Sequence, residues 1–404
     1  MAGHIFLSAG EPSGDLHASN LVLALRRLEP QLRCSGLGGR RLQQAGCQLL
    51  FPLAEHAVMG LWPALRSLPL FYQVLQQVED WLRHQRPDLV VLVDNPGFNW
   101  HVARRAKKFG IPVWYFVPPQ LWAWAGWRVR KMRQLVEHVL SGLPFETTWF
   151  RRHGVATDYV GHPYCDALAG QPRDEAFIQA QHQSGATIVG LLPGSRTHEV
   201  RHNFPTLLRT ACIVAQHFPG LRFLVACYQQ AHADWIADYL RDSHAPQPTK
   251  FRGVLHTPVA TPLSPDQIEV HVGKTAAIIE AAQMCVAVSG SVTLELLYHA
   301  RPSCVVYRIS PLARCLKPLL LTCRYITLVN LLAERMVFPE FVSVRCPARQ
   351  IAAALLFWLD NPAAWQRCRD ELNQLRQRFF QPGACQRAAQ LILRRLQTAG
   401  RRAA

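Results

Sequence analysis

The sequence is poor in acidic residues. It contains 27 Asp and Glu against 44 Lys and Arg, which gives a formal net charge of +17 at neutral pH over 404 residues. A surplus of this size indicates an anionic partner, and charge alone leaves open nucleic acid, an anionic membrane face or phosphorylated substrates. The basic residues are spread along the chain without a recognised nucleic-acid-binding module, so we expect no nucleic-acid partner.

Three other features are missing. No two of the 12 cysteines form a Cys-x-x-Cys pair, which argues against a disulfide framework or a zinc site and favours buried thiols in a reducing compartment. No uninterrupted apolar run of about 18 residues occurs, and the start "MAGHIFLSAGEPSGD" has no basic leader before its short apolar stretch. We therefore expect neither a transmembrane helix nor a signal peptide, and a cytoplasmic protein.

The hydrophobic residues, 49% of the chain, are arranged for an α/β fold. Short runs rich in Val, Ile and Phe, such as "DLVVLVD" and "ATIVGLLPG", alternate with longer segments of helical period, which is typical of parallel sheets. A chain of 404 residues also exceeds the usual size of one hydrophobic core. The sequence predicts two Rossmann-like lobes with a cleft between them and C-terminal helices that return to the first lobe.

The expected domain boundaries follow from where the strand runs stop. The polar stretch 165–187 contains Gly and Pro but no strand run, so we place the interdomain connection there. We predict an N-terminal lobe over 1–168, a second lobe over 186–345, and helices over 346–404 that pack back on the N-terminal lobe. The Pro-rich stretch 245–268 interrupts the alternation and predicts a surface loop or insertion.

The stretch "VAVSGSVTLELL" (286–297) joins a buried strand to a helix start. Its Ser289, Gly290 and Ser291 would bring backbone N–H groups and a helix N-terminus to a ligand, as α/β folds do for phosphates. Glu295 falls early in the helix, where it suits the dipole and would accept hydrogen bonds from sugar hydroxyls. An ordinary helix cap, with Glu295 complementing the dipole, explains the same residues equally well.

A second turn of this kind opens the second lobe. The stretch "GLLPGSRTHEV" ends a strand at Gly194 and Ser195, which are followed by Arg196 and, in the next helix, Glu199. An Arg beside a Gly-Ser turn offers a planar bidentate donor to a diphosphate, although an exposed loop Arg would look the same. Four more residues are expected to border the UDP-sugar site: Tyr307, Arg308, Asn330 and Glu340.

Several stretches, taken in order, match a known family. The chain contains "SAGEPSGDLHASNL", "VDNPGFNWHVARRAKKFGIPVWYFVPPQLWAWAGWRVRKM", "VGHPYCDAL", "LLPGSRTHEV", "SGSVTLELL" and "NLLAERMVFPEF". With them it resembles the lipid-A-disaccharide synthases, glycosyltransferases of the two-lobed GT-B type, over nearly its full length. The resemblance implies transfer of diacylglucosamine from UDP-diacylglucosamine to the 6-hydroxyl of diacylglucosamine 1-phosphate, with inversion and release of UDP. It also implies peripheral attachment to the inner face of the inner membrane, no metal and no other cofactor.

An inverting transfer needs a general base near the acceptor hydroxyl. Asp94, at the end of the apolar run "DLVVLVD", is the best-placed carboxylate of the first lobe, and Asn99 would then orient sugar hydroxyls. Members of the family often carry an acid three residues later, their usual candidate base, but here that position is Gly97, a form also found in the family. The predicted base is therefore Asp94, with Asp15 or Glu11 as reserves, although Asp94 would equally fit a helix cap.

The loop "GEPSGD" (10–15) resembles a shortened dinucleotide fingerprint but lacks the G-x-G-x-x-G spacing, which disfavours a nicotinamide enzyme. The resemblance puts this loop on the acceptor side of the site. The expected acceptor-side residues are Glu11, Ser13, Gly14 and Met59. His17 and His162 are better explained as partly buried, satisfied histidines than as acid–base groups.

Two aromatic stretches bear on membrane binding. The stretch 58–76, "VMGLWPALRSLPLFYQVLQ", has one charge, and we expect an exposed surface that receives acyl chains rather than a core helix. The stretch 118–133, "PPQLWAWAGWRVRKMR", sets three Trp before Arg and Lys, which suits anionic headgroups. For this second stretch we favour Trp residues packed inside the lobe, because the family carries "WAW" as a packed motif beside the cleft. A homodimer stays open.

Three functions stay open on the sequence. The first is the transferase described above, the second is a different GT-B UDP-sugar enzyme or a UDP-sugar epimerase, and the third is a non-catalytic homologue that binds sugar nucleotide or membrane. Gly97 keeps the third open. The expected nucleotide-loop residues of the second lobe are all retained, which favours the transferase.

Overall fold

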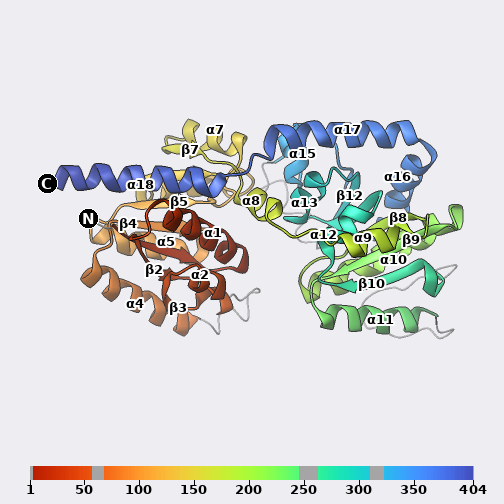
Figure 1. Ribbon diagram of the computed structural model, residues 1–404, viewed down its shortest axis with the longest axis horizontal. Coiled ribbons are helices and arrows are strands. Elements are labelled where there is room, and N and C mark those ends of the chain that lie inside the picture. The colour runs from red at the N-terminus through yellow and green to blue at the C-terminus, as the bar shows by residue number, and fades with distance from the viewer. Residues whose placement is uncertain (1–2, 57–67, 245–262, 310–322, 404) are drawn as a thin grey trace. The chain divides into compact units, whose positions relative to one another are not determined.

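The chain folds into two compact units, each built on one parallel sheet (Figure 1). The computed structural model describes residues 3–56, 68–244, 263–309 and 323–403. Unit 1 comprises Met1–Gly170, Leu320–Thr322 and Phe380–Ala404, and unit 2 comprises Gln171–Leu319 and Cys323–Phe379. The prediction of an α/β fold with two Rossmann-like lobes is confirmed.

Unit 1 holds a seven-stranded sheet in the order β3-β2-β1-β4-β5-β6-β7, in which all neighbours pair in parallel. Its elements are β1 (His4–Ala9), α1 (Pro12–Leu28), β2 (Arg33–Leu37), α2 (Arg40–Gln44), β3 (Gln48–Phe51), η1 (Leu53–His56), α4 (Leu68–Gln85), β4 (Leu89–Val93), α5 (Pro96–Lys108), β5 (Val113–Phe116), η2 (Gly126–Arg128), α6 (Val129–Leu135), β6 (His138–Ser141), α7 (Pro144–Arg152), β7 (Thr157–Tyr159), α8 (Pro163–Ala169) and α18 (Ala384–Ala403).

Unit 2 holds a six-stranded parallel sheet in the order β10-β9-β8-β11-β12-β13. Its elements are α9 (Glu175–His182), β8 (Thr187–Leu192), α10 (Thr197–His217), β9 (Leu221–Cys227), α11 (Gln230–His244), η3 (Pro265–Gln267), β10 (Ile268–Val272), α12 (Thr275–Ala281), β11 (Met284–Val288), α13 (Val292–Tyr298), β12 (Ser303–Arg308), α15 (Leu328–Ala333), β13 (Glu340–Ser343), α16 (Ala348–Asp360) and α17 (Pro362–Phe379).

Strand β4 shows why its sequence is an unbroken apolar run. All five of its side chains are fully buried, with Leu89, Val91 and Val93 in one hydrophobic cluster and Val90 and Leu92 in another. Successive side chains of a strand point to opposite faces, so the two clusters lie on the two faces of the sheet. Both faces of a doubly wound sheet are covered by helices, which removes the polar alternation seen in half-exposed strands.

Each sheet reverses its strand order at one place. In unit 1 the chain leaves β1 for β2 on one side and continues at β4 on the other, so the reversal lies between β1 and β4. In unit 2 the same reversal lies between β8 and β11. Ligands of open α/β sheets bind outside the carboxyl ends of the strands at such a point. The loops after β1, β4, β8 and β11 carry most of the residues predicted from the sequence as site residues.

The C-terminal helices divide between the two units, which differs from the expectation that 346–404 packs back on the first lobe as a whole. Helix α16 buries Ile351, Leu355 and Trp358 in the core of unit 2, and α17 also belongs to that unit. Only α18 returns to unit 1, where it lies along α1 (Figure 1). Asp166 of α8 accepts hydrogen bonds from the backbone N–H groups at its start, including that of Gly383 at 2.6 Å.

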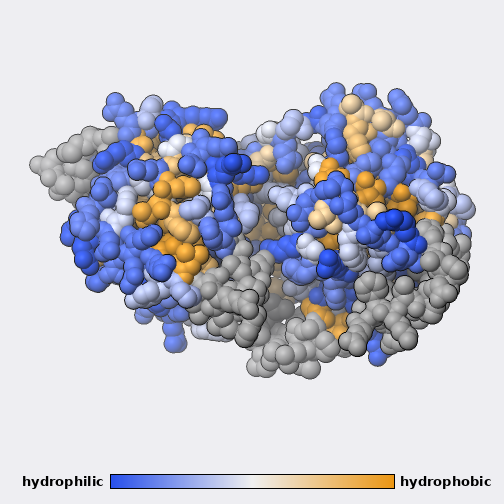
Figure 2. Space-filling model, turned by 90° about the horizontal axis from the view of Figure 1, so that it is seen from below, coloured by the Kyte–Doolittle hydropathy of each residue, from blue (hydrophilic) through white to orange (hydrophobic). Residues whose placement is uncertain are grey.

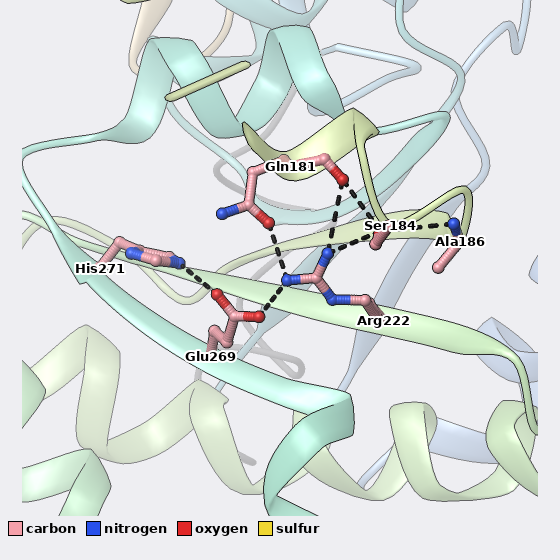
Figure 3. A network of polar contacts seen from close by, with 6 residues as sticks. All are labelled: Gln181, Ser184, Ala186, Arg222, Glu269 and His271. Atoms are coloured by element: carbon pink, nitrogen blue, oxygen red, sulfur yellow. Dashed lines mark hydrogen bonds and ion pairs between the residues drawn. The ribbon is translucent and has the colours of Figure 1, made fainter. Parts of the chain in front are cut away.

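Helix α9 belongs to unit 2, which therefore begins earlier than the expected residue 186. Figure 3 shows how it is attached: the Arg222 guanidinium donates to the backbone carbonyl and side-chain oxygen of Gln181, to Ser184 Oγ and to Glu269. His271 contacts the same Glu269 carboxylate at 3.2 Å. Arg222 and Glu269 are the second residues of β9 and β10, so this network lies at the amino-terminal edge of the sheet, away from the ligand-binding edge.

The apolar stretch 58–76 falls partly outside the described residues. Its described end begins α4, where Val74 and Leu75 are buried in the core and Tyr72 is 59% exposed. The expected exposed surface is therefore limited in this part to single side chains. On the face seen in Figure 2, unit 1 (left) is mostly hydrophilic around a patch of hydrophobic residues. Among the helices that the structure describes, none is long and apolar enough to span a bilayer.

Candidate functional site

Asp94 directly follows β4 at the reversal point of the first sheet. It and Asn95 have positive φ angles of 51° and 39°, and such left-handed backbone is uncommon outside glycine and is concentrated at functional sites. Ser13 Oγ donates to Asp94 Oδ2 at 3.2 Å. Burial raises the pKa of the Asp94 carboxyl, and hydrogen bonds from the Asn95 backbone and Ser13 act in the opposite direction. The result is a half-buried carboxylate of raised basicity at the expected ligand-binding edge.

Asn99 supports this turn from below. It is fully buried, its Nδ2 donates to the carbonyls of Ser8, Val93 and Asp94, and its Oδ1 accepts from Ser8 Oγ at 2.7 Å. The Tyr115 hydroxyl also donates to the Asp94 carbonyl, at 2.5 Å. With its amide engaged in this way, Asn99 positions the backbone of Asp94, which differs from the expectation that it orients sugar hydroxyls.

Asp15 has a structural role that the sequence did not reveal. Its carboxylate is 5% exposed and accepts hydrogen bonds from the backbone N–H groups of Gly39, Arg41 and Leu42, at 2.7, 3.1 and 3.2 Å. These groups surround the start of α2, where a carboxylate satisfies N–H groups that lack intrahelical partners. Asp15 is therefore committed to holding α2 and is poorly placed as a reserve base.

The loops after β1 and β4 approach each other closely. A Cβ atom at Gly10 would lie 1.8 Å from Asn95 Nδ2, so only glycine fits there. A Cβ atom at Gly97 would meet nothing nearer than Asn95 Oδ1 at 3.9 Å, so the position that carries an acid in other members has room for one. Glu11 is half-buried and Ser13 exposed in the β1 loop. Of the other acceptor-side residues, Gly14 is buried, and Met59 lies outside the described residues.

The two histidines of this region are held neutral. Burial lowers the pKa of His17 to about 3 and that of His162 to about 4. The rings meet edge to face with centroids 5.9 Å apart, and His162 Nδ1 accepts from the Tyr164 backbone N–H. A general acid or base works best with a pKa near the working pH, so neither histidine suits that role.

Glu146 is a buried ionisable group that the sequence did not single out. Its carboxyl accepts from Trp122 Nε1 at 3.0 Å and from Ser141 Oγ at 2.7 Å. Burial raises its pKa to about 7 against these hydrogen bonds. Glu146 thus anchors the Trp-rich segment through Trp122, which is buried as expected for that segment. Trp124 and Trp127 are 47% and 64% exposed, so the packed interpretation holds for only one of the three.

In unit 2, the turn after β8 is closed by its own carboxylate. Glu199 Oε2 accepts from the backbone N–H groups of Ser195 and Arg196 at 3.1 and 3.3 Å, and Glu199 Oε1 accepts from Arg196 Nη1 at 2.9 Å. Gly194 has a φ of +124°, and a Cβ atom there would lie 2.7 Å from Glu199 Cβ. The predicted anion seat exists in this loop, but a side-chain carboxylate of the same loop already occupies it.

The turn after β11 is open. Gly290 and Ser291 are exposed, and a Cβ atom at Gly290 would meet no atom within 4 Å. Ser289 Oγ lies 3.4 Å from the Ile326 carbonyl. Glu295 lies in the first turn of α13 and is buried, which suits the dipole better than contact with a large ligand.

The remaining expected residues fall into two groups. Asn330 and Glu340 brace the segment before β13: Asn330 accepts from the backbone N–H groups of Val337 and Phe338, and Glu340 accepts from those of Ile326 and Thr327. Tyr307 and Arg308 end β12, where Tyr307 is exposed and Arg308 Nη1 donates to the carbonyl of His202 at 2.9 Å. The described residues contain no group of three or more His, Cys, Asp or Glu side chains arranged for a metal ion.

Known proteins resemble this chain over nearly its whole length. It is 35% identical to the lipid-A-disaccharide synthase of Syntrophus aciditrophicus over 390 residues, which are 96% of this chain and 97% of that protein. It is 33% identical to the enzyme of the same name from Myxococcus xanthus, with 96% of each chain covered.

The fold also has solved relatives. The structure of UDP-GlcNAc 2-epimerase from Neisseria meningitidis bound to UDP-GlcNAc aligns with a TM-score of 0.64 at 10% identity, covering 97% of this chain and 100% of that one. At this identity the likeness concerns the fold alone. The sequence profile described as Lipid-A-disaccharide synthetase matches residues 5–246 and 248–394, so the chain belongs to this family of hexosyltransferases.

Proposed function

We propose that the chain transfers 2,3-diacylglucosamine from its UDP ester to the 6-hydroxyl of 2,3-diacylglucosamine 1-phosphate and releases UDP. The acceptor oxygen bonds to the anomeric carbon from the face opposite the leaving group, so the configuration inverts and a β-1,6-linked disaccharide 1-phosphate forms. The bond from that carbon to the diphosphate breaks, and its electron pair leaves with UDP. The observation that carries this proposal, beside the full-length family match, is the half-buried Asp94 carboxylate at the reversal point of the first sheet.

Asp94 takes the proton of the acceptor hydroxyl in this proposal. Burial makes its carboxylate more basic than a solvated one, and Ser13 holds one of its oxygens. Asn99 and Tyr115 fix the backbone on which it sits. A base needs such fixed geometry, because small displacements of a reacting group lower the rate strongly.

The turn 289–291 receives the diphosphate of the donor. Gly290 and Ser291 are exposed and unobstructed, whereas the N–H groups of Ser195 and Arg196 are bonded to Glu199. Arg196 reaches the diphosphate by exchanging its bond to Glu199 for one to a phosphate oxygen. Its charge then stabilises the leaving group as negative charge develops there.

The chain works at an anionic membrane surface in this proposal, on the cytoplasmic face of the inner membrane. Support comes from a cavity of about 440 Å³ whose lining includes Trp127, Arg130, Arg133, Arg152 and His153, with no carboxylate among its lining residues. The three arginines form no ion pair within the described residues, and Trp127 is 64% exposed. Clustered cations beside an exposed Trp suit phospholipid headgroups. Sedimentation in solution and on vesicles tests whether the working form is a homodimer.

The test compares wild type with Asp94→Asn for UDP release from UDP-diacylglucosamine, with and without diacylglucosamine 1-phosphate. We expect release only with acceptor, and a decrease of about 100- to 10,000-fold in the variant with donor binding unchanged. Arg196→Ala, in contrast, is expected to weaken donor binding. Tight UDP binding by wild type without any turnover would replace this proposal by a non-catalytic sugar-nucleotide-binding protein.

A further inference from the structure

Arg128 is a cation whose side chain lacks partners. Its Nε and Nη2 atoms are buried and accept no hydrogen-bond partner among the described residues, and no carboxylate there pairs with it. Burial lowers the pKa of its guanidinium, the usual sign of a cation that is desolvated without compensation. Leaving such N–H groups unsatisfied destabilises a fold, so a buried guanidinium of this kind normally has an anion to bind.

The chain itself does not provide this anion. The segments outside the described residues, 1–2, 57–67, 245–262, 310–322 and 404, contain neither Asp nor Glu. No carboxylate side chain from them is therefore available to neutralise Arg128. The missing partner is accordingly expected to be a ligand.

The guanidinium is held in place although it is unpaired. It lies over the Trp124 ring at 4.2 Å from the centroid, and its backbone N–H donates to the Ala125 carbonyl at 3.0 Å. Stacking of a guanidinium on an aromatic ring fixes its plane and leaves its edge free to donate two parallel hydrogen bonds. This geometry suits a phosphate group, which accepts such a pair.

Arg128 belongs to the same end of the first sheet as Asp94. The charges of Asp94, Glu11 and Arg128 all act on the Tyr115 hydroxyl, whose pKa is raised mainly by burial. That hydroxyl donates to the Asp94 carbonyl at 2.5 Å. Arg128 follows β5, and Asp94 follows the neighbouring strand β4. A cation here lies near the carboxylate that we assign to the acceptor hydroxyl.

We propose that Arg128 binds the phosphate group of the acceptor sugar through its free guanidinium edge and thereby selects a phosphorylated acceptor over an unphosphorylated one. This inference rests on the function proposed above, which places the acceptor beside Asp94. The donor diphosphate has the same chemistry and is the competing source of phosphate. We favour the acceptor because the open turn 289–291 already serves the donor in unit 2.

The deciding experiment measures binding and does not require turnover. Titration calorimetry gives the affinities of wild type, Arg128→Gln and Arg128→Lys for diacylglucosamine 1-phosphate, for diacylglucosamine and for UDP. We expect wild type to bind the phosphorylated sugar about 100-fold more tightly than the unphosphorylated one, and Arg128→Gln to lose most of this difference. Arg128→Lys should keep part of it, because an ammonium retains the charge but not the planar pair of donors.

Two further readouts separate binding from folding. Arg104→Gln, which removes an exposed arginine of α5, serves as the matched charge control and should bind all three ligands like wild type. Arg128→Gln should melt at the same temperature as wild type or higher, because it removes an unsatisfied buried cation. Excess diacylglucosamine 1-phosphate should raise the melting temperature of wild type more than that of the variant.

Several outcomes overturn the proposal. Equal wild-type affinity for the two sugars, or equal losses for both in Arg128→Gln, excludes a phosphate contact at Arg128. Weaker binding of UDP alone assigns Arg128 to the donor. Loss of UDP release with phosphate-selective binding intact would instead refute the proposed transfer while leaving the Arg128 site in place.

Discussion

Arg196 Nη1 donates a hydrogen bond to Glu199 Oε1 at 2.9 Å, so the arginine that we assign to the donor diphosphate is held by a carboxylate of its own loop. The same carboxylate also takes the Ser195 and Arg196 backbone N–H groups. A diphosphate must displace it to use these donors. Free and donor-bound forms should therefore differ in this loop.

Glu199→Gln removes the competing charge and should tighten UDP binding, by about 3- to 10-fold, since one charged hydrogen bond no longer has to be exchanged. Calorimetric titration with UDP measures this effect. Asp234→Asn, an exposed acid of α11, is the charge control. Weaker UDP binding by Glu199→Gln would show that the carboxylate orients Arg196 for the ligand and does not compete with it.

Gly97→Asp should be tolerated and should restore activity to Asp94→Asn. An added Cβ atom finds 3.9 Å of clearance, and the residue is exposed in the first turn of α5, where a carboxylate suits the helix dipole. We expect Asp94→Asn/Gly97→Asp to recover at least about 10-fold in kcat over Asp94→Asn, within the range of general-base catalysis. Gly97→Asn in the same background is the control and should recover nothing. Equal rates for the two double variants would remove position 97 from the base chemistry.

Asp15→Asn should destabilise the fold more than it impairs chemistry. The substitution weakens three hydrogen bonds at the start of α2, one of them by replacing an acceptor with a donor, and we expect a loss of about 1–3 kcal/mol in the free energy of unfolding. Denaturant unfolding measures it, and kcat at a temperature where the variant is folded should change little. A large loss of kcat with unchanged stability would return Asp15 to the list of bases.

Glu146 should make stability depend on pH. Its folded pKa of about 7 lies above the ordinary value of 4.5, so the native state binds its proton more tightly, and the favourable contribution present at low pH is lost as pH rises through 7. Glu146→Gln should therefore gain on wild type between pH 5 and 8, by up to about 3 kcal/mol. Unfolding at several pH values measures this gain. The control Glu137→Gln, at an exposed acid, should show no such trend, and a flat difference for Glu146→Gln would mean that Glu146 stays ionised.

The arginine cavity should determine binding to anionic vesicles. Arg130→Gln/Arg133→Gln/Arg152→Gln is expected to bind phosphatidylglycerol-containing vesicles about 10- to 100-fold more weakly than wild type, because each cation near the surface contributes about 1 kcal/mol. Arg27→Gln/Arg40→Gln/Arg41→Gln removes the same charge from exposed positions elsewhere in unit 1 and is the control. Equal losses in both triple variants would mean that net charge, and not this cavity, governs binding. Strong competition by soluble glycerol phosphate would indicate a phosphate site instead of a membrane contact.

Much of the candidate site could be predicted from single stretches. The Pro-Gly-Ser and Ser-Gly-Ser turns and the Asp94 turn each follow a strand, and strand ends are visible in sequence as apolar runs that stop at small or acidic residues. The roles of Asp15, Asn99 and Glu199 could not be predicted in this way. Each role depends on which backbone N–H or carbonyl groups come within hydrogen-bond distance, and for Asp15 and Ser8–Asn99 these belong to segments far away in the chain.

The sequence by itself determined the family, the two α/β units and the order of loops that carry polar residues, because these depend on local periodicity and on contiguous motifs. Tertiary structure alone decided that α16 and α17 stay with unit 2 while α18 joins unit 1, that Glu199 fills the anion seat of its own loop, and that Arg128 lies buried and unpaired beside Trp124. The physical reason is that burial and hydrogen-bond satisfaction are properties of a side chain's surroundings, which are assembled from residues that the sequence keeps far apart.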